Sequence, residues 1–170
     1  PYDHEDIITG QATAAKEMLE KVSLEAILAP VGGGGLLAGT ALASKYFGKG
    51  IDVFGTEPSG ADDAYRSLKG GTHITEHTPN TVADGLLTTL GELNYTLIKE
   101  NVKNILTVDD IEIIKAMRLI WERLKIIIEP SCAVPLAAVL CNKPLFSGKK
   151  IGIILSGGNV DLDPFFNDYL

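Results

Sequence analysis

Short apolar runs without polar alternation are the clearest feature of the hydrophobic pattern along this chain. Such runs are typical of strands that are buried on both faces of a sheet. They predict four strands, at residues 26–31, 51–56, 104–108 and 150–155. Between these runs, apolar residues recur three and four positions apart, as on one face of a helix. This periodicity predicts helices at residues 7–22, 36–47, 61–68, 86–102, 109–128 and 132–140.

The alternation of strands and helices predicts an α/β fold with a mostly parallel sheet flanked by helices. With 170 residues, the chain is long enough to form one domain with a hydrophobic core. Asp3 and Asp6 stand before or at the start of the first predicted helix, where an acidic side chain can act as an N-cap.

Four consecutive glycines, Gly32, Gly33, Gly34 and Gly35, separate the first predicted strand from the helix that follows. Because these residues have no side chains, their backbone N–H groups can turn toward one point. The start of the helix adds unpaired N–H donors and the positive end of its dipole. A flexible linker is the alternative, but linkers rarely lie directly between a buried strand and a Leu- and Ala-rich helix. The pattern therefore predicts a phosphate-binding turn.

Polar or glycine-rich turns follow three of the four predicted strands. They begin at Gly32, at Glu57 and at Ser156. In parallel sheets, ligands bind beyond the carboxyl ends of the strands. We therefore expect these three turns to converge on one cleft.

The charge balance limits the classes of partner. The net charge of −7 argues against nucleic acid or an anionic membrane surface as a partner. No apolar run approaches the roughly 18 residues that would span a bilayer. There is no pattern of a secretory signal peptide, so we expect a cytoplasmic protein.

The two cysteines, Cys132 and Cys141, lie nine positions apart in one apolar helical stretch. On a helix this spacing corresponds to a rise of about 13.5 Å, which is too long for a disulfide. We expect both to be buried free thiols.

A dinucleotide site is one alternative for the glycine turn. Gly33, Gly35 and Ala38 satisfy the pattern G-x-G-x-x-A, and Glu57 ends the next strand at the position of a ribose-binding acid. However, a helix is predicted before the first strand, and four glycines exceed what this fingerprint requires. An NAD-binding Rossmann domain is therefore the less favoured interpretation.

Two further groups of polar residues could bind a metal ion. His73 and His77 match H-x-x-E-H, a zinc motif that requires a helix, but the glycines and the proline around them predict a solvated loop. Glu57 and Asp63 offer oxygen ligands around a turn, which suits Mg²⁺ or Ca²⁺. On the residues alone, a helix cap in a solvated acidic turn is preferred for this second group.

Taken together, the motifs resemble the carboxyl-terminal half of fold-type II pyridoxal-phosphate enzymes, in the branch of serine racemases and threonine/serine dehydratases. The resemblance covers nearly the whole chain. It rests on residues 1–4 (PYDH), 8–13 (ITGQAT), 30–36 (PVGGGGL), 57–63 (EPSGADD), 83–85 (ADG), 121–125 (WERLK), 129–131 (EPS) and 156–162 (SGGNVDL).

This resemblance implies the large domain of a tryptophan-synthase-β-like fold and a role for several residues. The backbone amides of Gly32, Gly33, Gly34, Gly35 and Leu36 would hold the phosphate of pyridoxal 5′-phosphate, and Ser156 would face its pyridine nitrogen. Glu129 would lie in the cofactor cleft as the candidate catalytic residue. Glu57, the carbonyl of Ala61 and Asp63 would bind Mg²⁺, Ca²⁺ or Mn²⁺. Lys125 and Asn159 match positions that contact a nucleotide effector in animal serine racemases.

The resemblance also implies parts that these 170 residues do not contain. The segment with the Schiff-base lysine and the small domain are absent, so residues 1–170 would be the carboxyl-terminal portion of the large domain. We expect the complete protein to be a homodimeric racemase or ammonia-lyase. It would act on serine, threonine or a similar amino acid by removing the α-proton, followed by racemisation or β-elimination. The competing hypothesis is a truncated or non-catalytic ligand-binding domain with the same fold.

Overall fold

A parallel four-stranded sheet forms the centre of the computed structural model, which describes residues 2–163. Its strands are β1 (Ala26–Pro30), β2 (Asp52–Pro58), β3 (Asn104–Val108) and β4 (Ile151–Ile153). They lie in the order β3-β2-β1-β4, and Leu28 pairs with Phe54 on one side and with Ile153 on the other. The predicted α/β fold with a parallel sheet is confirmed.

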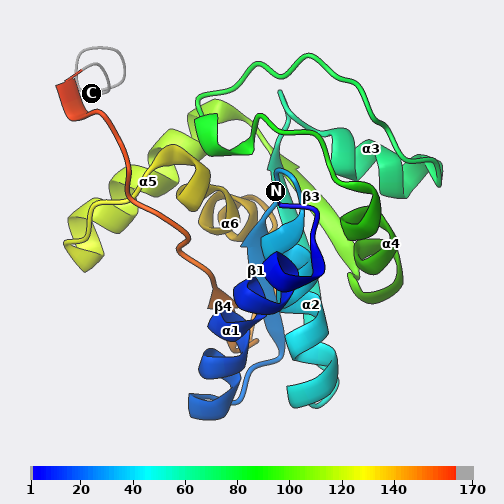
Figure 1. The fold of residues 1–170 in the computed structure, drawn as a ribbon. Coiled ribbons are helices and arrows are strands. Elements are labelled where there is room, and N and C mark those ends of the chain that lie inside the picture. The colour runs from blue at the N-terminus through cyan, green and yellow to red at the C-terminus, as the bar shows by residue number, and fades with distance from the viewer. Residues whose placement is uncertain (1, 164–170) are drawn as a thin grey trace.

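Helices cover both faces of this sheet (Figure 1). The helices are α1 (Glu5–Lys21), α2 (Gly35–Phe47), α3 (Asp63–Gly70), α4 (Glu92–Asn101), α5 (Asp110–Leu124), α6 (Pro130–Cys141) and α7 (Lys143–Phe146), with a short 3-10 turn η1 (Asp84–Leu86). The first four contribute to the core on one face, and the last three contribute to the core on the other. All five residues of β1 are buried, which explains their purely apolar sequence. Within residues 2–163, no helix is both long and apolar enough to cross a bilayer.

The predicted helix at residues 86–102 is wrong in its first part, because α4 begins only at Glu92. The Asp3 carboxylate accepts hydrogen bonds from the N–H groups of Leu93 and Asn94, in the first turn of α4. Asp3 therefore caps α4 and not the helix that follows it in sequence. The cap of α1 is His4, whose Nδ1 accepts the N–H of Asp6.

The predicted helix at residues 109–128 ends early, at Leu124. Lys125 has a φ of 60°, in the left-handed region, and its N–H bonds to the carbonyl of Trp121 as a C-cap. The Trp121 indole N–H then binds the carbonyl of Ile128 at 3.1 Å. After this turn of the chain, Glu129 is the N-cap of α6.

The two cysteines are both free, as predicted, but only Cys132 is buried; the prediction of burial is wrong for Cys141. Loss of hydration raises the pKa of both thiols, although Cys141 as a residue is exposed. We expect a maleimide reagent at neutral pH to modify Cys141 well before Cys132, because only the Cys141 sulfur is open to solvent. Peptide mapping by mass spectrometry measures this order, and Cys141→Ser should remove the fast phase. Equal rates at both sites would contradict the buried position of Cys132.

Candidate cofactor site

The glycine turn connects the end of β1 to the start of α2. Gly34 is the N-cap of α2 and has a φ of 93°, which an L side chain rarely adopts. The first turn of α2 contains no acidic residue. Its unpaired N–H groups and the positive end of the helix dipole are therefore available to an anion.

One cavity of about 370 Å³ opens over this turn. It brings together the glycine turn, the first half of α1, η1 with the segment after it, the start of α6 and the loop after β4. The lining residues are Tyr2, Ile7, Gln11, Pro30, Gly32, Gly33, Gly34, Gly35, Leu36, Gly85, Leu86, Thr88, Glu129, Ser131 and Ser156. All residues that the resemblance assigned to the cofactor, together with Glu129, thus lie around the same cavity.

Glu129 fixes the loop that carries Ser156. Its Oε2 accepts the N–H of Asn159 at 3.0 Å, and its own N–H bonds to the carbonyl of Gly157. A Cβ on Gly157 would lie 2.8 Å from Oε1 of Glu129, so a side chain at this position would displace the Glu129 carboxylate. Two residues later, in the first turn of α6, the Ser131 hydroxyl accepts the N–H of Gly85 at 2.9 Å.

Several lining residues were not assigned a role from the sequence. Tyr2 lies over the glycine turn, since a Cβ on Gly33 would overlap its ring, and its hydroxyl bonds to the carbonyl of Thr89 at 3.0 Å. Gln11 and Ser131 belong to segments on which the resemblance rests. This membership was the only indication in the sequence that they lie near the cofactor site. Thr88 lies in a segment that was predicted to be helical, so nothing pointed to it.

The acidic turn lies outside this cavity, so the expected convergence of three turns is wrong for Glu57. The Glu57 side chain is fully buried, and its two oxygens accept the N–H groups of Ala64 and Tyr65 at 3.2 and 2.8 Å. It therefore binds the first turn of α3 instead of facing the ligand. Burial raises the pKa of Glu57 well above its ordinary value, and the nearby charge of Asp63 raises it further.

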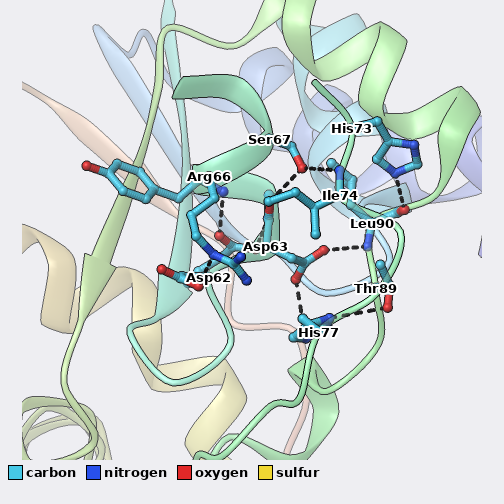
Figure 2. A network of polar contacts seen from close by, with 12 residues as sticks. Asp62, Asp63, Arg66, Ser67, His73, Ile74, His77, Thr89 and Leu90 are labelled. Atoms are coloured by element: carbon cyan, nitrogen blue, oxygen red, sulfur yellow. Dashed lines mark hydrogen bonds and ion pairs between the residues drawn. The ribbon is translucent and has the colours of Figure 1, made fainter. Parts of the chain in front are cut away.

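Asp63 is the centre of a buried polar network (Figure 2). Its Oδ2 accepts the N–H of Leu90 at 2.8 Å, and its Oδ1 lies 3.5 Å from Nε2 of His77. The segment with His73 and His77 is a loop, as predicted, but the prediction of solvation is wrong because the His77 side chain is only 5% exposed. Within residues 2–163, no cluster of three or more His, Cys, Asp or Glu side chains is arranged to hold a metal.

A family model described as "Pyridoxal-phosphate dependent enzyme" matches residues 1–157. The chain belongs to this family. It is 54% identical over 168 residues to a serine racemase of Dictyostelium discoideum, and 49% identical over 164 residues to a β-hydroxyaspartate dehydratase of Paracoccus denitrificans. These alignments cover 95% and 96% of this chain. The crystal structure of the Dictyostelium serine racemase superposes with a TM-score of 0.87, at 52% identity and over 94% of this chain.

The fold-type II resemblance is thereby confirmed, and the dinucleotide interpretation is wrong. The structure agrees, because Glu57 is buried away from the cavity and could not reach a ribose bound over the glycine turn. This member of the pyridoxal-phosphate family spans about half of its relatives, namely 52% of the racemase and 52% of the dehydratase. No lysine is found among the described residues that line its cavity.

The two residues matched to a nucleotide effector belong to different segments of the fold. Lys125 is the exposed C-cap of α5, and the N–H of Asn159 is bound to Glu129. Their role in effector binding stays a prediction.

Proposed function

We propose that the protein carrying this chain removes the α-proton of β-hydroxy amino acids with the help of pyridoxal 5′-phosphate, as a racemase or ammonia-lyase. The observation that carries this proposal is the single cavity that joins the glycine turn, Glu129 and Ser156. The similarity to a serine racemase and to a hydroxyaspartate dehydratase supports this substrate class. Both reactions start from the same proton removal, so the proposal covers both.

The glycine turn fits the cofactor phosphate in charge and in space. A Cβ on Gly32 would lie 3.0 Å from Oγ1 of Thr88, and a Cβ on Gly35 would lie 2.8 Å from the carbonyl oxygen of Tyr2. Side chains are therefore excluded where the N–H groups of Gly32 to Leu36 would hold the phosphate. The absence of acidic residues in the first turn of α2 leaves the positive end of the dipole unopposed.

Ser156 would face the pyridine nitrogen, held in place by the bonds of its loop to Glu129. A neutral hydroxyl does not enforce protonation of that nitrogen as a carboxylate would. When bound, the cofactor supplies an electron sink for the pair left behind by the α-proton. The role of this chain is to bind the phosphate, orient the ring and shape one wall of the site.

The amine that joins the cofactor would come from the part of the protein that this chain does not span. Its relatives are about twice as long, and the described lining of the cavity includes no lysine. We infer that residues 1–170 are the carboxyl-terminal portion of the large domain. A homodimer and a cytoplasmic location stay predictions.

The visible spectrum of the purified, unsupplemented protein tests the proposal. We expect an absorbance band of bound pyridoxal phosphate, and an intact mass that includes sequence beyond these 170 residues. Incubation with L-serine or threo-3-hydroxyaspartate should then release a keto acid and ammonia, or give the opposite enantiomer. A colourless protein whose mass is that of the 170 residues would instead support the non-catalytic alternative.

We also infer a divalent cation site at Glu57, the carbonyl of Ala61 and Asp63. Two carboxylates that are both at most 1% exposed raise each other's free energy, and a cation between them would relieve this repulsion. Two carboxylates and one carbonyl, completed by water, form a donor set typical of Mg²⁺ or Ca²⁺.

We expect Asp63→Ala to abolish stabilisation by Mg²⁺. At a concentration about 100-fold above its Kd, the ion should stabilise the wild type by about 2.7 kcal/mol, seen as a rise in Tm. The variant should show no rise, whereas Asp62→Ala should respond like the wild type, because Asp62 pairs with Arg66 at the surface. A wild type that does not respond to Mg²⁺ or Ca²⁺ would rule out the site.

A further inference from the structure

Helices α3 and α4 carry the same pair of side chains, a tyrosine followed four positions later by a lysine. The pairs are Tyr65 with Lys69 and Tyr95 with Lys99. This spacing brings both members of a pair to one face of the helix. Nζ of Lys69 donates to the Tyr65 hydroxyl at 3.0 Å and lies 5.2 Å from the ring centroid, and the distances for Lys99 and Tyr95 are 3.3 and 5.3 Å. Each ammonium group is therefore held in place by a hydrogen bond and a cation–π contact.

A second cavity, of about 430 Å³, opens between these two helices and the start of β3. Helix α3 contacts both α4 and β3 (Figure 1). Three lysines line this lysine cavity, together with an aromatic and apolar wall; they are Lys69, Lys99 and Lys103, and the wall includes Tyr65, Leu68 and Val102. The cavity lies where β3 begins, whereas the glycine turn follows the end of the parallel strand β1. It shares no described lining residue with the cofactor cavity, which is therefore a separate site.

The residues matched to a nucleotide effector are also distant from the lysine cavity in the fold. Lys125 ends α5, which packs on the other face of the sheet. Asn159 lies in the loop held by Glu129 at the cofactor cavity. Neither is among the described residues that line the lysine cavity.

The charge in the lysine cavity is only partly balanced. Nζ of Lys103 lies 2.6 Å from a carboxylate oxygen of Asp52, so this pair is neutral. Within residues 2–163, Lys69 and Lys99 bond only to neutral oxygens, namely the two tyrosine hydroxyls and, for Lys99, the carbonyl of Gly71 at 3.4 Å. The carboxyl ends of α3 and α4 offset about half a charge each, so a net positive field remains in a chain whose net charge is −7. Each of the two ammonium groups also has at least one N–H left for a ligand.

We propose that the lysine cavity is a second ligand site, which binds a small phosphate monoester with an apolar body. Lys69 and Lys99 donate to the phosphate oxygens from two neighbouring helices, and the body packs against Leu68, Val102 and the Tyr65 ring. A phosphate monoester has three terminal oxygens and close to two negative charges at neutral pH, so it can accept from both ammonium groups at once. A carboxylate has one charge and fewer acceptor positions. This site does not depend on the proposed reaction.

Isothermal titration of the full-length protein, with its cofactor bound, tests this site with phenyl phosphate as the probe. The bound cofactor keeps the probe away from the glycine turn. We expect saturable binding of phenyl phosphate, and at least about fivefold weaker binding of inorganic phosphate, which lacks the apolar body. Benzoate should also bind at least about fivefold more weakly, because it has a single charge. Added NaCl at about 0.5 M should weaken the binding of phenyl phosphate, because the ammonium groups are exposed.

Variants of the two lysines locate the binding, whether or not the glycine turn is occupied. Lys69→Gln and Lys99→Gln each remove one charge and keep most of the side-chain length, so each should weaken the binding of phenyl phosphate about three- to tenfold. The double variant should bind no better than the wild type binds benzoate. Lys45→Gln is the matched control, because Lys45 is an exposed lysine in the last turn of α2 and does not line the cavity. It should bind the probe as the wild type does.

Three results would overturn the proposal. The first is the absence of saturable binding of phenyl phosphate up to about 10 mM. The second is binding that Lys69→Gln and Lys99→Gln leave unchanged, since the probe would then lie elsewhere. The third is equal affinity for phenyl phosphate and benzoate, which would contradict a site for two negative charges. Both lysines are exposed, so the variants should keep the wild-type Tm and the circular dichroism spectrum, and a loss of binding then reports on the site alone.

Discussion

Gly34→Ala is expected to lower the free energy of unfolding by about 2–4 kcal/mol and to abolish phosphate binding at the glycine turn. The residue has a φ of 93°, where an alanine is strained. Its new Cβ would also lie 2.6 Å from Cδ1 of Leu90 and 2.9 Å from Cβ of Asn94, both in the buried interior. Relief of these overlaps requires that α4 or the glycine turn move, and either movement disrupts the N–H groups that face the anion.

Urea denaturation and phosphate titration measure the two effects of Gly34→Ala. Gly10→Ala is the matched control, because no atom lies within 4 Å of a Cβ at this position inside α1. It should stabilise the protein by about 0.5–1 kcal/mol, owing to the better helix propensity of alanine. If Gly34→Ala were as stable as the wild type and bound phosphate, the arrangement of the glycine turn against Leu90 would be wrong.

Asn94→Asp is expected to cost about 3–5 kcal/mol, the range for a buried charge without a partner. The Asn94 side chain is fully buried, and its Nδ2 donates to the carbonyls of Gly33 and Tyr2 at 2.7 and 3.1 Å. A carboxylate there has no N–H to donate to these carbonyls, and it would repel an anion at the glycine turn. A stability loss under about 1 kcal/mol would contradict the bonds assigned to this amide.

The pH dependence of Asn94→Asp follows from the same contacts. Burial beside two carbonyl oxygens would raise the pKa of the new carboxyl, since both disfavour the charged form. The loss of stability should therefore be smaller at about pH 5 than at about pH 8. At the higher pH the carboxyl group ionises freely in the unfolded protein, whereas in the folded protein ionisation is unfavourable, so folding becomes less favourable. Asn101→Asp is the control, because its Nδ2 makes one bond within α4, to the carbonyl of Leu97. It should change stability little at either pH.

The sequence predicted the features of this fold that depend on neighbouring residues. The apolar run of β1 and the glycines after it are read locally. The end of α5 at Leu124 was not found, because the predicted helix ran on to residue 128. The start of α4 could not be found in this way. Leu90 and Gly91 leave the helical pattern because Asp63 and Gly33 bind their N–H groups, and these partners are 27 and 58 positions away in the chain.

The residues of the candidate site also differ in whether local sequence could place them. The glycine turn and Ser156 line one cavity, as expected of turns that follow strands at one edge of a parallel sheet. Glu129, which the resemblance assigned to the cofactor cleft, lines the same cavity, and the roles of all three stay predictions. The position of Glu57 was mistaken, because its carboxylate satisfies the N–H groups at the start of α3 instead of facing the cleft. Its burial depends on how α3 packs on the sheet, which no local pattern records.

The strap formed by Tyr2 and Asp3 has a consequence for the order of events in folding. Its bonds reach Thr89, Leu93 and Asn94 across sequence separations of 87 to 92 residues. Closing a loop of this length is entropically costly and follows the local contacts of α1, β1 and α2. Tyr2 therefore settles over the glycine turn late, after the first turn of α4 has left the ribosome. A newly made chain can form most of its sheet contacts between β1 and β2 before it has a complete place for an anion.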